Sequence, residues 1–262
     1  MSMFMSVLRL SWQLFRGTIE AKYRRSFLGY VWMVFPAIAI TGGVSLASQS
    51  GVIRPGQSSS LPYPLFVFIG VLIWQVFVDA VDVSHKAVDG ARSYLTKVNC
   101  AREAIVLAQL YETLIIDVVR LALLVLLVVL FNGGEWRAAA VLALCFTGAV
   151  VFGLGIGALL MPFTILFGDL QHGVKVVLTY GIFLTPAFYA PQGSGLFARL
   201  VQCSPLAPLM GSARDAAAGM AISQPGFFVA ILGASIVVLV MGMLMIRVSA
   251  PILVERMLMG GR

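Results

Sequence analysis

Residues 20–36, EAKYRRSFLGYVWMVFP, pass within a few positions from a cationic cluster to a long apolar run. The cations are Lys22, Arg24 and Arg25. Such residues suit an anionic leaflet surface, where each near-surface cation contributes roughly 1 kcal/mol. The rings of Tyr30 and Trp32, a few residues on, are amphipathic and settle at the level of the lipid headgroups. The stretch therefore predicts a boundary between the cytoplasm and a bilayer.

The composition is that of an integral membrane protein. Hydrophobic residues make up 60% of its 262 residues and charged residues 11%, against about 25% charged in a soluble domain. The apolar runs are long enough for membrane-spanning helices. A net charge of +7 is compatible with nucleic-acid binding, but the cations flank apolar runs, which favours membrane topology. Arg9 and Arg16 interrupt the first apolar residues, so no cleavable signal peptide is predicted.

We expect an all-α integral membrane protein that forms one domain over residues 1–262, with about six spans. The predicted spans are 27–48, 63–81, 104–131, 137–161, 174–189 and 227–248. Pro36 is expected to kink the first span and Pro162 to end the fourth. Residues 196–201 and 206–210 are apolar but too short to span, so they predict re-entrant or interfacial helices at the outer face. Gly153 and Gly157 predict close helix packing.

Residues 3–22 predict an amphipathic helix that lies in the inner interface. Its polar face comprises Ser6, Arg9, Gln13, Arg16 and Glu20. This helix is either a plain membrane anchor or an anchor that also docks a cytoplasmic partner.

The distribution of cations predicts the orientation. Of the 18 Lys and Arg residues, 13 fall on the side of the N-terminus, and Arg120 falls within a span. The other four are Arg54, Arg137, Arg199 and Arg214. The positive-inside rule then puts both termini in the cytoplasm, as an even number of spans also requires.

Three short motifs carry a family resemblance. Residues 22–26, KYRRS, followed by FLGYVW and Pro36, resemble the start of the transmembrane subunits of ABC-2-type exporters, above all those for lipid-linked polysaccharides (O antigen, capsule, teichoic acid). Residues 97–103, KVNCARE, resemble the family pattern KKVxFPRE, with Asn-Cys-Ala at the aromatic-proline pair. Residues 167–172, FGDLQH, resemble its aromatic-Arg-Asp-x-x-His turn, with Gly168 at the arginine.

The resemblance implies a division of labour between subunits. It implies a homodimer of this chain in the bacterial inner membrane, with two ABC nucleotide-binding subunits that bind ATP and Mg²⁺. This chain itself would need no cofactor. The loop between the second and third spans would hold a coupling helix, residues 88–98, that contacts the ATPase. The coupling candidates are Val88, Arg92, Tyr94 and Lys97.

Two sets of residues are candidates for contacts with a polyprenyl-pyrophosphate-linked glycan. Sugar rings stack on aromatic faces, so aromatic side chains could line a channel. These candidates are Tyr30, Trp32, Tyr180, Phe183, Phe188 and Tyr189. The alternative is that they form a lipid-facing belt. Lys22, Arg24 and Arg25 could bind the pyrophosphate through charge-assisted hydrogen bonds, although topology alone would also place them at the inner surface.

Three ionisable residues fall within the third predicted span: Glu112, Asp117 and Arg120. An unpaired charge at mid-bilayer costs about 2.5–3.5 kcal/mol on the insertion scale. Asp117 and Arg120 are three residues apart on one helix face and can pair. We interpret them as a structural pair inside the bundle; the alternative is an intramembrane enzyme that uses Glu112 or Asp117 as acid or base.

Motifs for catalysis, ATP binding and metal binding are missing from the sequence. It contains no G-x-x-x-x-G-K-[ST], no H-E-x-x-H and no G-x-S-x-G. His172 has no partner ligands at a useful spacing, and the three cysteines show neither metal-ligand spacing nor a disulfide pattern. We therefore expect no catalytic and no metal site. A secondary carrier also fits these observations, and an ABC-2 exporter of a drug or small lipid is the alternative to a glycan exporter.

Overall fold

A computed structural model describes residues 9–17, 31, 34–51, 61–95, 102–132, 136–189 and 195–259. Every regular element in these ranges is helical. Residues 9–17 are α-helical. The other elements are α2 (Phe35–Gln49), α3 (Tyr63–Leu95), α4 (Arg102–Asn132), α5 (Trp136–Leu166), α6 (Gly168–Tyr180), the 3₁₀ helix η2 (Gly181–Leu184), α7 (Leu196–Gln202), α8 (Ala207–Ala217) and α9 (Pro225–Met259). The predicted all-α class is confirmed.

Four of these helices are long and apolar enough to cross a membrane. The candidate spans are Tyr63–Val83, Leu110–Phe131, Trp136–Thr164 and Pro225–Ser249. They coincide with the second, third, fourth and sixth predicted spans. The described helices in the first and fifth predicted spans are α2, with 15 residues, and α6, with 13. The total of six spans stays a prediction.

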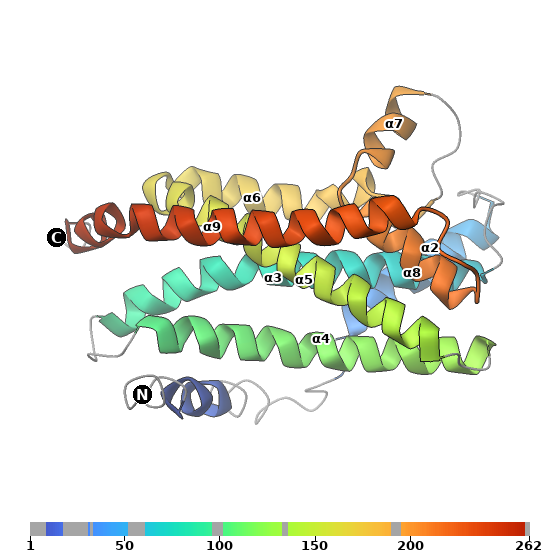
Figure 1. Cartoon of the computed structure of the whole chain (residues 1–262), viewed down its shortest axis with the longest axis horizontal. Helices are drawn as coiled ribbons and strands as arrows, with labels where there is room; N and C mark the ends of the chain where they lie inside the picture. Colours follow the sequence, from blue (N-terminus) through green and yellow to red (C-terminus); the bar gives the residue numbers. More distant parts are fainter. Residues whose placement is uncertain are drawn as a thin grey trace.

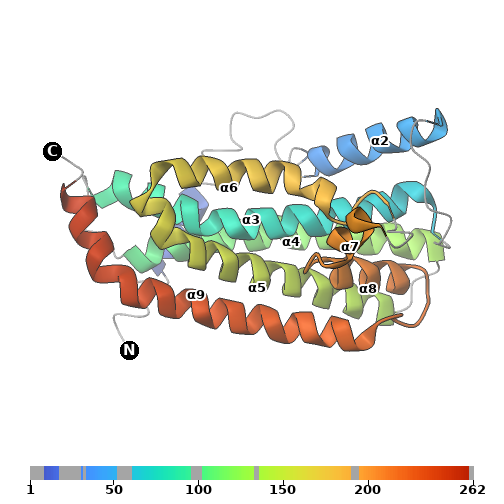
Figure 2. The same cartoon turned by 90° about the horizontal axis from the view of Figure 1, so that it is seen from above.

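Helix α5 is the centre of the bundle, and its glycines explain why. It contacts α3 and α9 most extensively and also touches α4, α6 and α8; Figure 2 shows it between α3 and α9. A Cβ on Gly153 would lie 2.6 Å from the Phe77 carbonyl oxygen of α3, and one on Gly155 would lie 2.7 Å from the Leu239 nitrogen of α9. Neither position has room for a side chain. For Gly153, this is the close helix packing that the sequence predicted.

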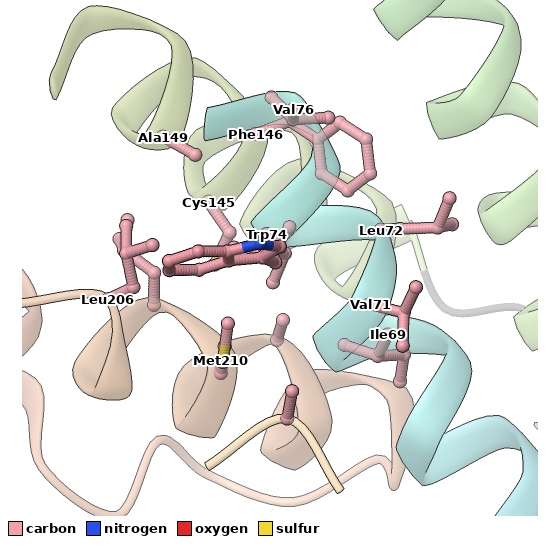
Figure 3. Packing of buried hydrophobic residues seen from close by; sticks show 14 of the residues in the cluster. Ile69, Val71, Leu72, Trp74, Val76, Cys145, Phe146, Ala149, Leu206 and Met210 are labelled. Atoms are coloured by element: carbon pink, nitrogen blue, oxygen red, sulfur yellow. The ribbon is translucent and has the colours of Figure 1, made fainter. Parts of the chain in front are cut away.

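The hydrophobic core is built around α3. In the most apolar window of its span 72% of the residues are buried, against 17% for α9 and 22% for α4. Figure 3 shows the indole of Trp74 among side chains of α5 and α8, including Cys145 and Met210. Its Nε1 donates a hydrogen bond to the Leu178 carbonyl of α6, at 3.2 Å. Helix α3 is thus enclosed by protein, whereas α4 and α9 leave apolar faces for lipid or another protein.

The two ends of the bundle differ in character. In Figures 1 and 2 the short helices α7 and α8 gather where α3 begins, while residues 9–17 and the end of α9 lie at the opposite end, where α3 finishes. Helix α8 is largely buried and contacts α3, α5 and α9. The two short helices predicted between the last spans are therefore present, and α8 is inserted into the bundle.

Several predicted boundaries are wrong. Pro36 lies in the first turn of α2, where no backbone N–H is needed, so it starts this helix and does not kink it. Pro162 lies inside α5, which continues to Leu166. Such a proline is tolerated in membrane helices, where neighbouring groups satisfy the freed carbonyl.

The segment after the second predicted span and the bounds of α6 also differ from prediction. Of the expected coupling helix at residues 88–98, residues 88–95 continue α3 without a break, and residues 96–98 lie outside the described residues. A helix satisfies its own backbone, so it can leave the bilayer without ending. Of the expected inner loop 167–172, only Phe167 lies outside a helix, because residues 168–172 form the first turns of α6. The predicted span 174–189 breaks after Tyr180 into η2 and a turn, where Pro186 holds Thr185 in an extended conformation.

Candidate functional site

The turn after η2, residues 185–189, is held by side chains of α3 and α8 and by its own Tyr189. The Tyr63 hydroxyl of α3 donates to the Phe188 carbonyl at 3.0 Å. The Tyr189 hydroxyl donates to the Phe183 carbonyl at 2.7 Å. Arg214 of α8 donates through Nη2 to the Ala187 carbonyl at 2.9 Å. The turn is therefore a fixed structure in which a proline-broken backbone finds its hydrogen-bond partners in neighbouring helices.

The aromatic candidates near this turn divide into two groups. Tyr180 and Phe183, three residues apart along α6 and η2, are 63% and 58% exposed. Phe188 is only 7% exposed and belongs to the hydrophobic core, with its ring centroid 5.5 Å from that of Phe183. Tyr189 is partly buried against the same core. Tyr180 and Phe183 therefore have exposed rings, while Phe188 and Tyr189 pack against the core beneath them.

A charged cluster joins α3 to α4. Arg120 Nη1 lies 2.6 Å from Asp79 Oδ2 and 3.4 Å from Asp117 Oδ1. The predicted pairing of Asp117 with Arg120 is confirmed, but the shorter contact goes to α3. Asp117 is buried, and no described residue donates a hydrogen bond to its Oδ2. Glu112, the third polar candidate, is partly buried on α4. The cluster therefore connects two helices, which agrees with its interpretation as a structural pair inside the bundle.

Sequence reasoning missed two members of these sites. Asp79 was not among the candidate residues, yet it is the closest acidic partner of Arg120. Arg214 was counted among the outer-loop cations, yet it is buried on α8. Its apolar sequence context, with Leu209, Met210 and a run of alanines, is the signal that could have indicated burial.

The helix at residues 9–17 has the predicted amphipathic character. Arg9, Gln13 and Arg16 are exposed, and Phe15 is buried. The rings of Trp12 and Phe15 each lie 6.2 Å from the ring of Tyr111 on α4. This helix therefore packs on α4 through aromatic contacts, with its cations on the free side.

The remaining candidates cannot be placed in full. Lys22, Arg24, Arg25, Tyr30, Trp32 and Lys97 lie outside the described residues. Val88, Arg92 and Tyr94 fall on the last turns of α3, for which the structure gives the backbone path only. Within the described ranges, no group of three or more His, Cys, Asp or Glu side chains lies where it could hold a metal ion.

Comparison with known proteins supports the family resemblance. No family model matches the chain. A curated protein from Myxococcus xanthus, the O-antigen export system permease protein RfbA, is 28% identical over 200 residues, which cover 74% of this chain and 74% of the relative. This similarity agrees with the fold, with the four candidate spans and with the motif at residues 22–36. The resemblance of this multi-pass membrane protein to the ABC-2-type permeases of polysaccharide exporters is thereby confirmed.

Proposed function

We propose that this chain is the transmembrane subunit of an ABC exporter that moves a lipid-linked polysaccharide across the bacterial inner membrane. The observation that carries the proposal is the similarity to an O-antigen export permease over three quarters of both chains. In this proposal two copies form the pathway, and two separate nucleotide-binding subunits bind ATP and Mg²⁺. This chain is then a transport subunit and not an enzyme.

The length of α3 supports the proposal that an ATPase powers transport from the cytoplasmic side. Its 33 residues make a helix about 50 Å long, whereas the hydrocarbon core of a bilayer is about 30 Å thick. The part beyond Val83, the end of the candidate span, carries the coupling candidates Val88, Arg92 and Tyr94, with Lys97 shortly after it. An ATPase that binds this end would act on a rigid rod that runs through the core of the bundle. The orientation follows from the cation distribution, with both termini in the cytoplasm.

The exposed aromatic pair supports a sugar or lipid ligand. Tyr180 and Phe183 present their rings from one helical face without being needed for the core. A polymer can slide over such faces without binding tightly at any one place. Lys22, Arg24 and Arg25 would receive the pyrophosphate at the inner surface.

A deletion strain of the organism that carries the gene tests the proposal as a whole. We expect loss of surface polysaccharide and accumulation of lipid-linked glycan inside the cell, restored by the wild-type gene. Co-purification of a nucleotide-binding subunit with the wild-type chain, and its loss on replacing Arg92 and Lys97 with Ala, would confirm the coupling role. Normal surface polysaccharide in the deletion strain, with altered drug or small-lipid export, would support the alternative substrate class.

The headgroup role needs a separate test. Replacement of Arg24 and Arg25 with Gln is expected to reduce surface polysaccharide at a matched level of protein in the membrane. The control is Arg137→Gln, a cation predicted on the outer side. Unchanged export by the double variant would exclude pyrophosphate binding by these arginines.

A further inference from the structure

Arg214 binds two segments that are far apart in the sequence. From α8, its Nε donates to the Phe66 carbonyl of α3 at 3.2 Å, and its Nη2 donates to the Ala187 carbonyl at 2.9 Å. The guanidinium carbon lies 3.5 Å from the centroid of the Phe66 ring. One side chain thus joins α8, the first turn of α3 and the turn at residues 185–189.

The backbone of α3 is shaped to accept this side chain. A Cβ on Gly70 would lie 2.6 Å from Arg214 Nη2 and 2.7 Å from the Ala187 carbonyl oxygen. Such distances are too short for real atoms, so any side chain at position 70 would displace the guanidinium or the turn. Gly70 on one helix and Arg214 on another therefore form a matched pair.

The buried guanidinium stays charged at neutral pH. Burial lowers the pKa of Arg214 to about 9, while the nearby Asp215 carboxylate acts in the opposite direction. Two carbonyl dipoles and an aromatic face stabilise this charge, and a planar guanidinium can use all three at once. Lysine has no planar fork and cannot reproduce the arrangement.

The first half of α3 also makes hydrogen bonds on both sides of η2. Trp74 donates to the Leu178 carbonyl, and Tyr63 donates to the Phe188 carbonyl. With the Arg214 contacts, α3 fixes both the end of α6 and the turn that follows η2. The same unbroken helix ends at Leu95, twelve residues beyond its candidate span.

We propose that Arg214 is a positioning residue that ties α8 to α3, so that movement of α3 at its Leu95 end displaces α8 and the turn at residues 185–189. The tie is a property of the chain alone. The source of the movement rests on the proposed function, because an ATPase would have to act on the Leu95 end.

The first experiment tests the tie on the full-length chain without any ATPase. Spin labels on Pro62→Cys and Met220→Cys, both exposed, report the position of the segment after α8 relative to the start of α3. Cys203 is exposed, so it is replaced by Ser together with Cys100. Cys145 is buried and is kept. Pulsed EPR in nanodiscs then gives the distance distribution.

We expect a narrow distribution for the parent chain and a broad one for Arg214→Gln, Arg214→Lys and Gly70→Ala. The double variant Gly70→Ala with Arg214→Gln should be no broader than either single variant, because both changes break the same contact. Arg199→Gln, on an exposed arginine of α7, is the matched control and should leave the distribution narrow. A narrow distribution in Gly70→Ala, or in Arg214→Lys, would overturn the tie.

The second experiment adds the nucleotide-binding subunit and tests transmission. Labels on Met220→Cys and Leu130→Cys, the latter 71% exposed on α4, report the position of α8 within the bundle. ATP binding should shift this distance in the parent chain, and Arg214→Gln and Gly70→Ala should abolish the shift while the ATPase stays bound and active. A shift that persists in these variants would overturn transmission through Arg214. Failure of any ATPase to bind the parent chain would instead contradict the proposed function, and the first experiment would still decide the tie.

Discussion

Arg120 of α4 lies 2.6 Å from the Asp79 carboxylate of α3 and 3.4 Å from the Asp117 carboxylate of its own helix. The contact across the helices is therefore the shorter one, although Asp117 is the partner that helical spacing indicates. Two carboxylates share one guanidinium in the apolar part of the bundle. Removal of the cation would leave both carboxylates uncompensated.

Arg120→Gln is expected to destabilise the protein strongly. Loss of one partner of a buried ion pair costs about 3–5 kcal/mol, and we expect the lower part of this range because the Asp79 side chain is 31% exposed. The measurement is the thermal unfolding midpoint in detergent. Adding Asp79→Asn should recover part of the loss, and Asp82→Asn, on the same helix, is the control. An unchanged midpoint in Arg120→Gln would show that the charged cluster does not stabilise the bundle.

Gly155→Ala is expected to loosen the packing of α9 on α5. The new Cβ would meet the α9 backbone at Leu239, which cannot move aside as a side chain can, so we expect a loss of about 1–3 kcal/mol. Gly233→Ala is the matched control, because nothing lies within 4 Å of a Cβ at that position and alanine favours the helix by about 1 kcal/mol. Unfolding midpoints of the two variants should move in opposite directions. Equal behaviour would contradict the role given to α5.

The aromatic residues near η2 should separate stability from transport. Phe188→Ala, in the core, is expected to cost about 3–5 kcal/mol of stability. Phe183→Ala and Tyr180→Ala, on exposed rings, should change stability by about 0.5 kcal/mol or less and yet reduce export. Surface polysaccharide at matched protein levels is the measurement, with Phe131→Ala, an exposed ring on α4, as the control. If Phe183→Ala and Tyr180→Ala export normally, these rings face lipid.

The sequence predicts what rests on long apolar runs and local spacing. The four long spans and the two short helices α7 and α8 follow from run lengths, and the pairing of Asp117 with Arg120 follows from helical periodicity. The close approach at Gly153 follows from the tendency of small residues to gather at helix interfaces.

The contacts between distant segments could not be predicted. The partner of Arg120 on α3 depends on how two helices pack, which one sequence does not reveal. The burial of Arg214 depends on a glycine that lies 144 positions earlier in the chain. Local cues for Pro36, Pro162 and the end of α3 were ambiguous, because a proline can start or interrupt a helix and polar residues can continue one.

The most direct test of the central claim is ATP hydrolysis in liposomes, measured with the chain alone and with its co-purified nucleotide-binding subunit. The account predicts no hydrolysis by the chain alone. With the partner it predicts hydrolysis, accompanied by transfer of lipid-linked glycan across the membrane. ATP hydrolysis by the chain alone, or glycan transfer without any nucleotide-binding subunit, would contradict it.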